Sequence, residues 1–268
     1  MLRIKLSVVH ALLLIAVVGG LAGCASTPAD STAGLSPNEI YAQAKDAVDA
    51  NQFDKAIPLY EKLEARAAGT PLAQQAQLEK ALAHYRNSEP AQAVATLDRF
   101  MKLHPASPAL DYAIYLKGII YFNDDLGLFS AITRQDPSER DQKASKDAFE
   151  AFKELVARFP DSRYAPDAAQ RMNYIVASLA QYEVHVARYY YKRGAYLAAA
   201  NRAQLALADY RNVSALEEAL FILYKSYDAL GMQQLSADAR RVLERSYPDS
   251  EFLTKGEKTK DEPWWKVW

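Results

Sequence analysis

Apolar residues recur along most of the chain at steps of three and four, which is the period of a helix with one buried face. The pattern is clearest between Pro71 and Pro105, where two such stripes flank a short polar stretch. That stretch ends in Pro90, and proline can begin a helix but cannot lie inside one. The region therefore predicts two helices, at about 72–86 and 90–103, which fold back on each other as a hairpin.

Four further stretches between residues 36 and 250 repeat this hairpin pattern. Every return helix has a small residue at the same place, namely Ala56, Ala93, Ala148, Ala199 and Ser236. Hairpins of about 34 residues resemble the tetratricopeptide repeat, and a single one cannot bury its apolar face without neighbours. The sequence predicts an all-α fold, a right-handed superhelical solenoid of about five tetratricopeptide-like hairpins and about ten helices, without strands.

Two features interrupt the regular spacing of the repeats. An insertion near 123–140 separates the two helices of the third hairpin, and it contains the apolar residues Leu126, Leu128, Phe129 and Ile132. A disordered loop does not favour such residues, so we expect the insertion to fold back on the third hairpin or to contact a partner. A helical pattern at about 164–193 is long enough to bridge two repeats and then open the fourth hairpin.

The repeats divide into two groups, with the first two in 36–105 and the other three in 106–250. Capping boxes, in which a serine and a glutamate three residues later cap a helix start, are predicted at Ser36 and Ser214. The pattern is lost in 251–268, a tail that is expected to be mostly disordered. That tail holds all three tryptophans of the chain, Trp264, Trp265 and Trp268.

The N-terminus has the features of a secretory leader. Two basic residues precede the apolar run 6–18, which is short for a membrane span. Leu21-Ala22-Gly23-Cys24 follows and resembles a bacterial lipobox, which implies a lipoprotein signal peptide at 1–23 and a lipid on Cys24. Ala25 rather than aspartate after the cysteine favours the outer membrane, by resemblance to bacterial lipoproteins. Residues 24–35 read as a flexible tether, and the alternative is an ordinary signal peptide with an accidental cysteine.

Composition and charge exclude several classes of function. The 268 residues are 50% hydrophobic and 24% charged, with a formal net charge of −1, so no basic surface for nucleic acid is indicated. The histidines of the mature chain are far apart, and no metal-binding pair, phosphate-binding glycine loop or serine elbow occurs. We therefore expect no enzymatic activity, no metal and no cofactor other than the lipid. A solenoid of hairpins offers instead a groove for extended peptides or partner domains.

Two groups of residues are candidates for such binding. Arg202 has no acidic residue within four positions, so a salt bridge within its own helix is unavailable. It is either a solvated surface residue or bonded to a carboxylate in another repeat or a partner. In the first two hairpins, Tyr41, Tyr60 and Tyr85 are candidates to line a substrate groove, although most such tyrosines pack the hairpins.

Several stretches of the mature chain resemble the BamD (ComL) family of outer-membrane lipoproteins. These are Pro37-Asn38-Glu39-Ile40-Tyr41, Asp98-Arg99-Phe100 with His104-Pro105, Asp111-Tyr112 with Tyr115 and Gly118, Arg140-Asp141, Phe159-Pro160-Asp161-Ser162, and Arg193-Gly194-Ala195 with Asn201-Arg202. The resemblance covers about 210 residues. It implies a scaffold of the β-barrel assembly (BAM) complex in the outer membrane.

The resemblance also implies partners and a location. Members of the family face the periplasm, dock on the POTRA domains of the barrel protein BamA and hold accessory lipoproteins. They receive unfolded outer-membrane protein precursors, with the N-terminal hairpins associated with precursors and the C-terminal ones with BamA. On this basis Arg202, Phe129, Arg140 and Asp141 are candidates for partner contacts. Precursor strands that end in an aromatic residue suit a tyrosine-lined groove, so a fragment ending near Pro105 is expected to bind them. The alternative is another periplasmic repeat scaffold that coordinates cell-envelope machinery.

Overall fold

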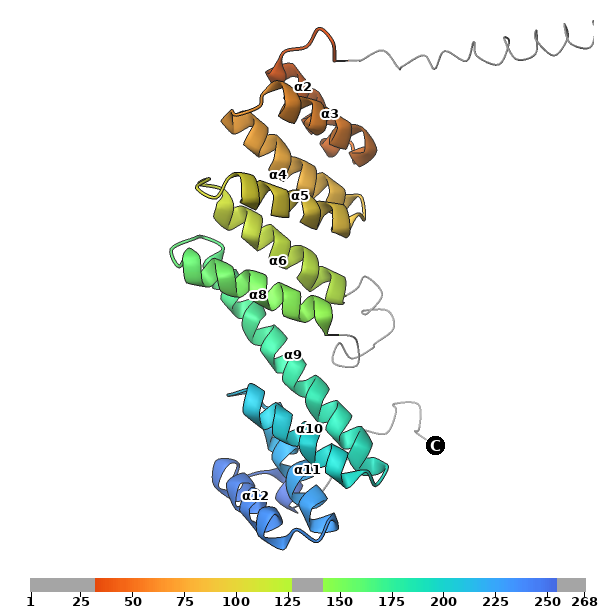
Figure 1. The fold of residues 1–268 in the computed structure, drawn as a ribbon, viewed down its shortest axis with the longest axis vertical. Helices are drawn as coiled ribbons and strands as arrows, with labels where there is room; N and C mark the ends of the chain where they lie inside the picture. The colour runs from red at the N-terminus through yellow and green to blue at the C-terminus, as the bar shows by residue number, and fades with distance from the viewer. Residues whose placement is uncertain (1–31, 127–141, 255–268) are drawn as a thin grey trace, which may run out of the picture.

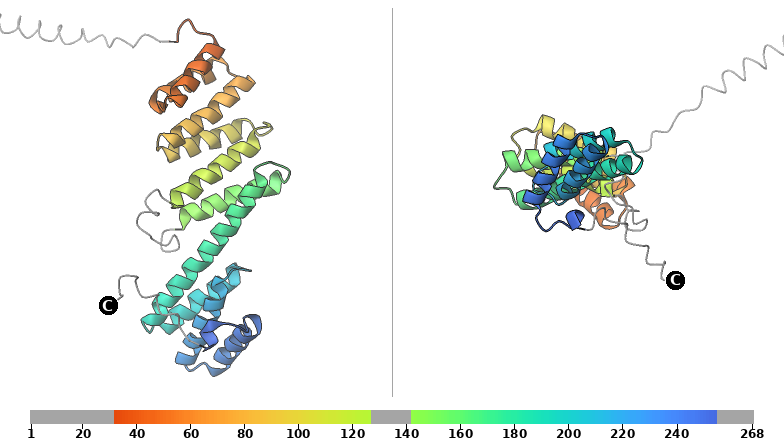
Figure 2. Two further views of the ribbon diagram at one scale, coloured as in Figure 1. Left: turned by 180° about the vertical axis from the view of Figure 1, so that it is seen from behind. Right: turned by 90° about the horizontal axis from the view of Figure 1, so that it is seen from below.

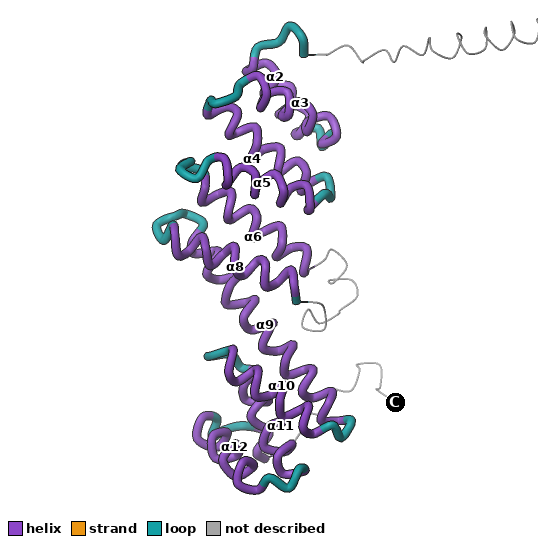
Figure 3. The backbone as a smooth tube through the Cα atoms, in the orientation of Figure 1, coloured by secondary structure: helices purple, strands orange, loops and turns teal. Residues whose placement is uncertain are grey.

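The computed structural model describes residues 32–126 and 142–254 of the chain. Within these two ranges the structure consists of helices and connecting loops, with no strand (Figure 3). The helices are α2 (Pro37–Asp49), α3 (Phe53–Arg66), α4 (Pro71–Arg86), α5 (Pro90–Leu103), α6 (Leu110–Leu126), α8 (Lys143–Arg158), α9 (Ala165–Lys192), α10 (Tyr196–Asp209), α11 (Ala215–Ala229), α12 (Gln233–Ser246) and α13 (Glu251–Thr254). The predicted all-α repeat solenoid is confirmed.

Successive helices pair as antiparallel hairpins that stack along one long axis (Figure 1). The five hairpins are α2–α3, α4–α5, α6–α8, α9–α10 and α11–α12. Four of the hairpin turns contain a residue with a left-handed backbone, at Asn51 (φ 55), Ser88 (φ 62), Gly194 (φ 74) and Gly231 (φ 72). Glycine and asparagine adopt this conformation at little cost, and they occupy three of these four turn positions. The repeat is therefore set as much by its turns as by its apolar stripes.

Helix α9 joins two parts of the molecule (Figures 1 and 2). Its first half packs on α8, and its second half packs on α10 and α11. We call α2–α8 the N-terminal unit and α10–α13 the C-terminal unit. Tyr210, at the end of α10, contacts the apolar clusters on both sides. The predicted double role of this long helix is confirmed.

Close helix approach in the third hairpin depends on one glycine. A Cβ atom at Gly118 of α6 would lie 2.5 Å from Cε1 of Phe152 in α8. The Phe152 ring is fully buried and cannot move aside easily. Glycine at this position lowers the helix propensity of α6. Because it has no side chain, the Phe152 ring can fill the space between the two helices.

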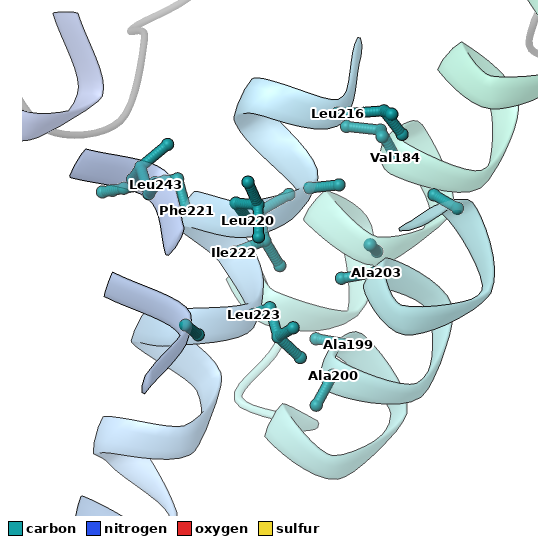
Figure 4. Packing of buried hydrophobic residues seen from close by; sticks show 14 of the residues in the cluster. Val184, Ala199, Ala200, Ala203, Leu216, Leu220, Phe221, Ile222, Leu223 and Leu243 are labelled. Atoms are coloured by element: carbon teal, nitrogen blue, oxygen red, sulfur yellow. The ribbon is translucent and has the colours of Figure 1, made fainter. Parts of the chain in front are cut away.

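The C-terminal unit has a continuous apolar core (Figure 4). Leu216, Leu220, Leu223 and their neighbours from α11 pack against alanines of α10 and Val184 of α9. Alanines make up half of this cluster, and they let the helices approach closely. Phe252 of α13 closes the end of the core by stacking on Phe221, with ring centroids 5.1 Å apart.

The structure corrects four details of the sequence interpretation. Residues 123–126, assigned to the insertion, belong to helix α6. Ser214 makes no side-chain capping bond, whereas the capping box at Ser36 is present. Residues 251–254, assigned to the disordered tail, form α13 because Phe252 is buried against α11. The end of the predicted tether, 32–35, forms a turn.

That turn is held by Arg66 at the end of α3. Its Nη1 atom donates to the carbonyl oxygen of Thr32 at 2.5 Å and to that of Leu35 at 3.1 Å. These two bonds satisfy backbone carbonyls that precede the first helix. The chain is therefore fixed to the first hairpin from Thr32 onward.

Candidate functional site

A groove of about 560 Å³ lies in the N-terminal unit, between α4, the start of α6 and the residues that precede α9. It is lined by Gln75, Leu78, Glu79, Leu82, Pro108, Ala109, Asp111, Tyr112, Arg163 and Tyr164. The first four come from one face of α4, at spacings of three and four. The groove thus sits where the second hairpin meets the third, and the start of α9 closes one side.

Stacked aromatic rings form one wall of this groove. The Tyr164 ring lies 5.6 Å from that of Tyr112 and stacks on that of Tyr115 at 4.7 Å, centroid to centroid. The Tyr115 hydroxyl donates to Asp167 Oδ2 at 2.7 Å, and Arg171 Nε donates to the same oxygen at 2.6 Å. The wall is therefore fixed by hydrogen bonds to α9 and presents the Tyr112 and Tyr164 rings to the groove.

Burial and nearby carboxylates favour the neutral form of Tyr112 and Tyr115. Burial, together with the Glu79 and Tyr164 side chains, raises the pKa of Tyr112. Burial and the bond to Asp167 raise the pKa of Tyr115. Burial acts to raise the pKa of Asp167, but the bonds from Arg171 and Tyr115 outweigh it and lower that pKa. These shifts favour the neutral form of Tyr112 and Tyr115 and the ionised form of Asp167 behind them.

The charged residues of the groove are partly compensated within the chain. Glu79 lies 3.7 Å from Lys45 Nζ of α2. Asp111 accepts 2.7 Å hydrogen bonds from the Ser162 hydroxyl and the Tyr112 backbone amide. Arg163 is exposed, and its guanidinium lies over the Tyr164 ring, 4.7 Å from the centroid. The groove therefore combines an apolar floor, an aromatic wall and polar groups at its rim, as ligand sites do.

The structure separates the three tyrosines that the sequence assigned to a groove. Tyr41 is near it, because its hydroxyl accepts a 2.7 Å hydrogen bond from Gln75 Nε2. Tyr60 is fully buried, 6.4 Å from Tyr41 between ring centroids, so its assignment to an accessible surface is wrong. Tyr85 accepts a hydrogen bond from Asn123 and is not among the lining residues. Tyr60 and Tyr85 serve packing between hairpins.

Sequence reasoning missed the third hairpin's share of the groove. Tyr112, Arg163 and Tyr164 all line it. Tyr112 belongs to a stretch that carries the family resemblance, but nothing in the pattern pairs it with a residue more than fifty positions later. A fragment ending near Pro105 lacks these three residues, so it is no longer expected to carry a complete groove.

Arg202 has an intramolecular partner that the sequence did not reveal. Its Nη1 atom lies 2.9 Å from Oε2 of Glu183, a residue of α9 that is only 8% exposed. The bond to Glu183 raises the pKa of Arg202, although partial burial acts in the opposite direction. The predicted charge-assisted bond is present, but it joins the two helices of one hairpin rather than two repeats.

A second polar cluster lies between α3, α4 and α5. Lys80 is 6% exposed, and its Nζ lies 3.0 Å from Oε2 of Glu64. The other oxygen of Glu64 is 2.5 Å from Arg99 Nη2 and accepts a hydrogen bond from Gln77. Burial acts to raise the pKa of Glu64, but these donors outweigh it and lower that pKa. The first two hairpins are thus joined through a buried ionic network as well as through apolar contacts.

Several predicted sites lie outside the described residues. They are Cys24, Phe129, Arg140, Asp141 and the three tryptophans of the tail. Leu126 is described only as part of the α6 backbone. Leu128 and Ile132 lie in the same undescribed segment as Phe129. Where the structure is described, no group of three or more His, Cys, Asp and Glu side chains is placed to hold a metal ion.

Comparison with known proteins identifies relatives over nearly the whole chain. A model of the family YfiO, described as an outer membrane lipoprotein, matches residues 34–243. A protein of Neisseria meningitidis serogroup A named outer membrane protein assembly factor BamD is 46% identical over 92% of both chains. Its namesake in Vibrio cholerae is 31% identical over 84% of this chain and 92% of its own. This chain belongs to the BamD family.

Among solved structures, a putative kinesin light chain from Podosopora anserina with TPR-like repeats aligns with 81% of this chain. It has a TM-score of 0.34 and 16% sequence identity. The chain is associated with the outer membrane, because the family to which it belongs is described as an outer membrane lipoprotein. None of the helices in the described ranges combines the length and apolar character that a membrane span needs.

Proposed function

We propose that this chain is a non-enzymatic, lipid-anchored scaffold of the outer-membrane β-barrel assembly complex. Its N-terminal groove receives segments of unfolded outer-membrane protein precursors. The observation that carries this proposal is the groove itself, in a member of a family whose relatives are named outer membrane protein assembly factors. An apolar floor formed by Leu78 and Leu82 and a fixed wall of tyrosines suit an extended peptide with aromatic residues.

The C-terminal unit serves as the docking element for a BamA-like barrel protein, through its periplasmic POTRA domains. Support comes from the exposed apolar residues of this unit. They include Leu197, Met232 and Leu235, whose side chains are 58%, 42% and 46% exposed. Six of the nine large hydrophobic residues that are exposed in the described ranges lie in this unit, and exposed apolar surface can mark a protein–protein interface. Accessory lipoproteins are further partners in this proposal, and an acyl chain on Cys24 holds the scaffold on the periplasmic side of the outer membrane.

Recovery of the native complex tests this function. The full-length chain is isolated from its own membranes in mild detergent, and the proteins that accompany it are identified by mass spectrometry. The proposal expects a barrel protein with POTRA domains together with small lipoproteins. Recovery of cell-wall or division machinery without a barrel protein would favour the other class of periplasmic scaffold and contradict the proposal.

The lipid anchor requires a separate measurement. Intact-mass spectrometry of the purified chain should show that it begins at Cys24 and that this residue bears acyl groups. A mature chain with an unmodified thiol, or one that begins elsewhere, would show that the anchor is wrong without affecting the groove.

A further inference from the structure

A second cavity of about 560 Å³ lies on the face of α4 opposite to the groove. α4 contributes Ala73, Gln77 and Lys80 to it, and the helical period directs these positions away from the groove-lining Leu78 and Leu82. The other walls are the end of α3, the α3–α4 turn and the end of α5, which lie on one side of the stack (Figure 3). We call this cavity the rear pocket. Because the two cavities use different faces of α4, both can be occupied together.

An exposed leucine forms the apolar edge of the rear pocket. Leu103, the last residue of α5, is 54% exposed, and no other large hydrophobic side chain is exposed among the described residues of α2–α8. Ala65, Ala68 and Ala73 line the pocket beside it. This leucine and the small residues give the pocket room and apolar surface for a hydrocarbon chain.

Charged groups of both signs lie at the mouth of the rear pocket. Arg99 lies one turn before Leu103 on α5 and is exposed, and its Nη2 atom lies 2.5 Å from Oε1 of Glu64. Glu61 is exposed as well, and its Oε1 atom lies 3.8 Å from Nζ of the buried Lys80. A guanidinium forms planar contacts with a phosphate, and a carboxylate accepts from an ammonium group. The pocket therefore fits a ligand with an anionic group, a cationic group and a hydrocarbon chain, as in a zwitterionic phospholipid.

The rear pocket lies beside the point at which the chain enters the first hairpin. Ala65, which lines the pocket, directly precedes Arg66, whose Nη1 atom donates to the carbonyl oxygen of Thr32 at 2.5 Å. The eight residues 24–31 that precede this fixed point span at most about 28 Å. A lipid on Cys24 therefore keeps this end of the first hairpin within that distance of the bilayer.

We propose that the rear pocket rests on the phospholipid surface of the membrane that holds the chain, with Leu103 among the acyl chains and Arg99 at the phosphates. This inference rests on the proposed function, because the lipid anchor supplies the proximity. One leucine binds a membrane weakly from solution, but a short tether raises the effective concentration to the order of millimolar. Since the groove lies on the other face of α4, this contact turns the groove away from the bilayer.

Fluorescence quenching by labelled lipids tests this orientation. Cys24 is the one cysteine of the chain, and its thiol carries the lipid in the proposed mature protein, so an added cysteine can be labelled selectively. A fluorophore is attached at Ala68 in the rear pocket or at Gln75 in the groove of the full-length acylated chain. The chain is placed in vesicles of phosphatidylethanolamine and phosphatidylglycerol that contain a headgroup-labelled nitroxide lipid. Quenching at Ala68 is expected to exceed that at Gln75 about threefold or more.

Substitution of the exposed leucine tests the contact itself. Leu103→Glu places a charge where acyl chains are expected, so it should lower quenching at Ala68 to about the level at Gln75. Leu103→Phe keeps an apolar side chain and should preserve the difference. Val242→Glu is the matched control, because Val242 is 47% exposed on α12 at the other end of the molecule. It should leave quenching at both positions unchanged, and circular dichroism should show the same helix content in all variants.

The outcomes separate this inference from the proposed function, because intact-mass spectrometry of the same sample reports acylation of Cys24. In an acylated sample, equal quenching at Ala68 and Gln75 would overturn the contact and leave the anchored scaffold in place. Quenching at Ala68 that survives Leu103→Glu would overturn it as well. A photoreactive residue at Ala68 that forms adducts with a protein in native membranes would assign the rear pocket to a protein partner instead. A chain without acyl groups would contradict the proposed anchor and the inference together.

Discussion

The N-terminal unit packs its hairpins around three separate apolar clusters, one of which extends onto α9, whereas the C-terminal unit shares one continuous cluster with the end of α9. Where the N-terminal hairpins meet, the contacts include the buried Lys80–Glu64 pair and leave the groove open. Where the C-terminal hairpins meet, alanines bring the helices together, and Phe252 seals the end. The same repeat thus yields a unit with a groove between its hairpins and a unit with one continuous core.

The difference follows from which residues occupy the helix contacts. Small residues on α10 allow α11 to approach closely, so that the two helices share one continuous apolar core. Tyrosines and polar side chains from α4, the start of α6 and the residues before α9 line the groove instead. We infer that the unit with the groove serves ligands with extended chains and the unit with the continuous core serves as a firm base for docking.

The two units should lose stability separately, because each repeat contacts mainly its neighbours. Phe152→Ala removes a fully buried ring from the third hairpin and should cost about 3–5 kcal/mol of unfolding free energy. Hydrogen exchange should become faster in α6 and α8, while α11 and α12 keep their protection. The half-buried Phe149 on the same helix is the matched control, and Phe149→Ala should cost clearly less. Equal acceleration in both units would break the proposed division.

The link between α9 and α10 should depend on the Arg202–Glu183 pair. Arg202→Glu places a second carboxylate beside the buried Glu183 and should cost about 2 kcal/mol, since the arginine is partly exposed. Adding Glu183→Arg reverses the pair and should restore part of that loss in chemical denaturation. Unchanged stability and wild-type recovery of membrane partners for Arg202→Glu would refute this role.

The ionic network of the N-terminal unit gives a pH-dependent stability. The pKa of Glu64 is lowered by folding, so its contribution is present above its unfolded pKa of about 4.5 and is lost as the pH falls through the folded value. Glu64→Gln should therefore cost about 1–2 kcal/mol at pH 7, and the difference should shrink below pH 4.5. Glu61→Gln removes an exposed carboxylate that lies 3.8 Å from Lys80 Nζ, and it should have a clearly smaller effect than Glu64→Gln at pH 7. A difference for Glu64→Gln that grows in acid would contradict the network.

The smallest expected change in stability concerns Ser36 and Ser214, the two serines for which capping boxes are predicted. Ser36→Ala removes a cap that the structure contains, and about 1 kcal/mol should be lost. Ser214→Ala removes no capping bond, so the free energy of unfolding should stay within about 0.5 kcal/mol. Thermal unfolding of the two variants measures both values. A larger loss for Ser214 would mean that the C-terminal unit uses this residue in a way that its geometry does not show.

The order and bounds of the helices could be predicted because apolar periodicity, proline at helix starts and turn residues all act locally. Pro71 and Pro90 begin helices at the positions where the sequence placed them. The capping box at Ser214 was predicted by the same local rule and is absent, because the serine has helical backbone angles. Local rules therefore gave the repeats and failed where the surrounding fold fixes the backbone.

The composition of the groove could not be predicted, because it depends on residues that the fold brings together from α4, the start of α6 and the residues before α9. Tyr112 and Tyr164 are separated by a hairpin with an insertion, and no pattern in the sequence pairs them. Glu183 was missed as the partner of Arg202 for the same reason, since its distance along the chain exceeds any helix spacing. Tyr60 was assigned to the surface although its stripe position, between buried Ala56 and Leu63, already indicated packing.

Site-specific crosslinking tests most directly whether the grooved unit receives precursors. A photoreactive residue replaces Gln75 or Leu82 in the groove, or Leu197 or Leu235 in the C-terminal half of the full-length chain. Each variant is illuminated with the same peptide, copied from the last strand of a barrel protein. We expect adducts from the two groove positions and none from the other two. Adducts confined to Leu197 and Leu235 would contradict the assignment of precursor binding to the N-terminal groove.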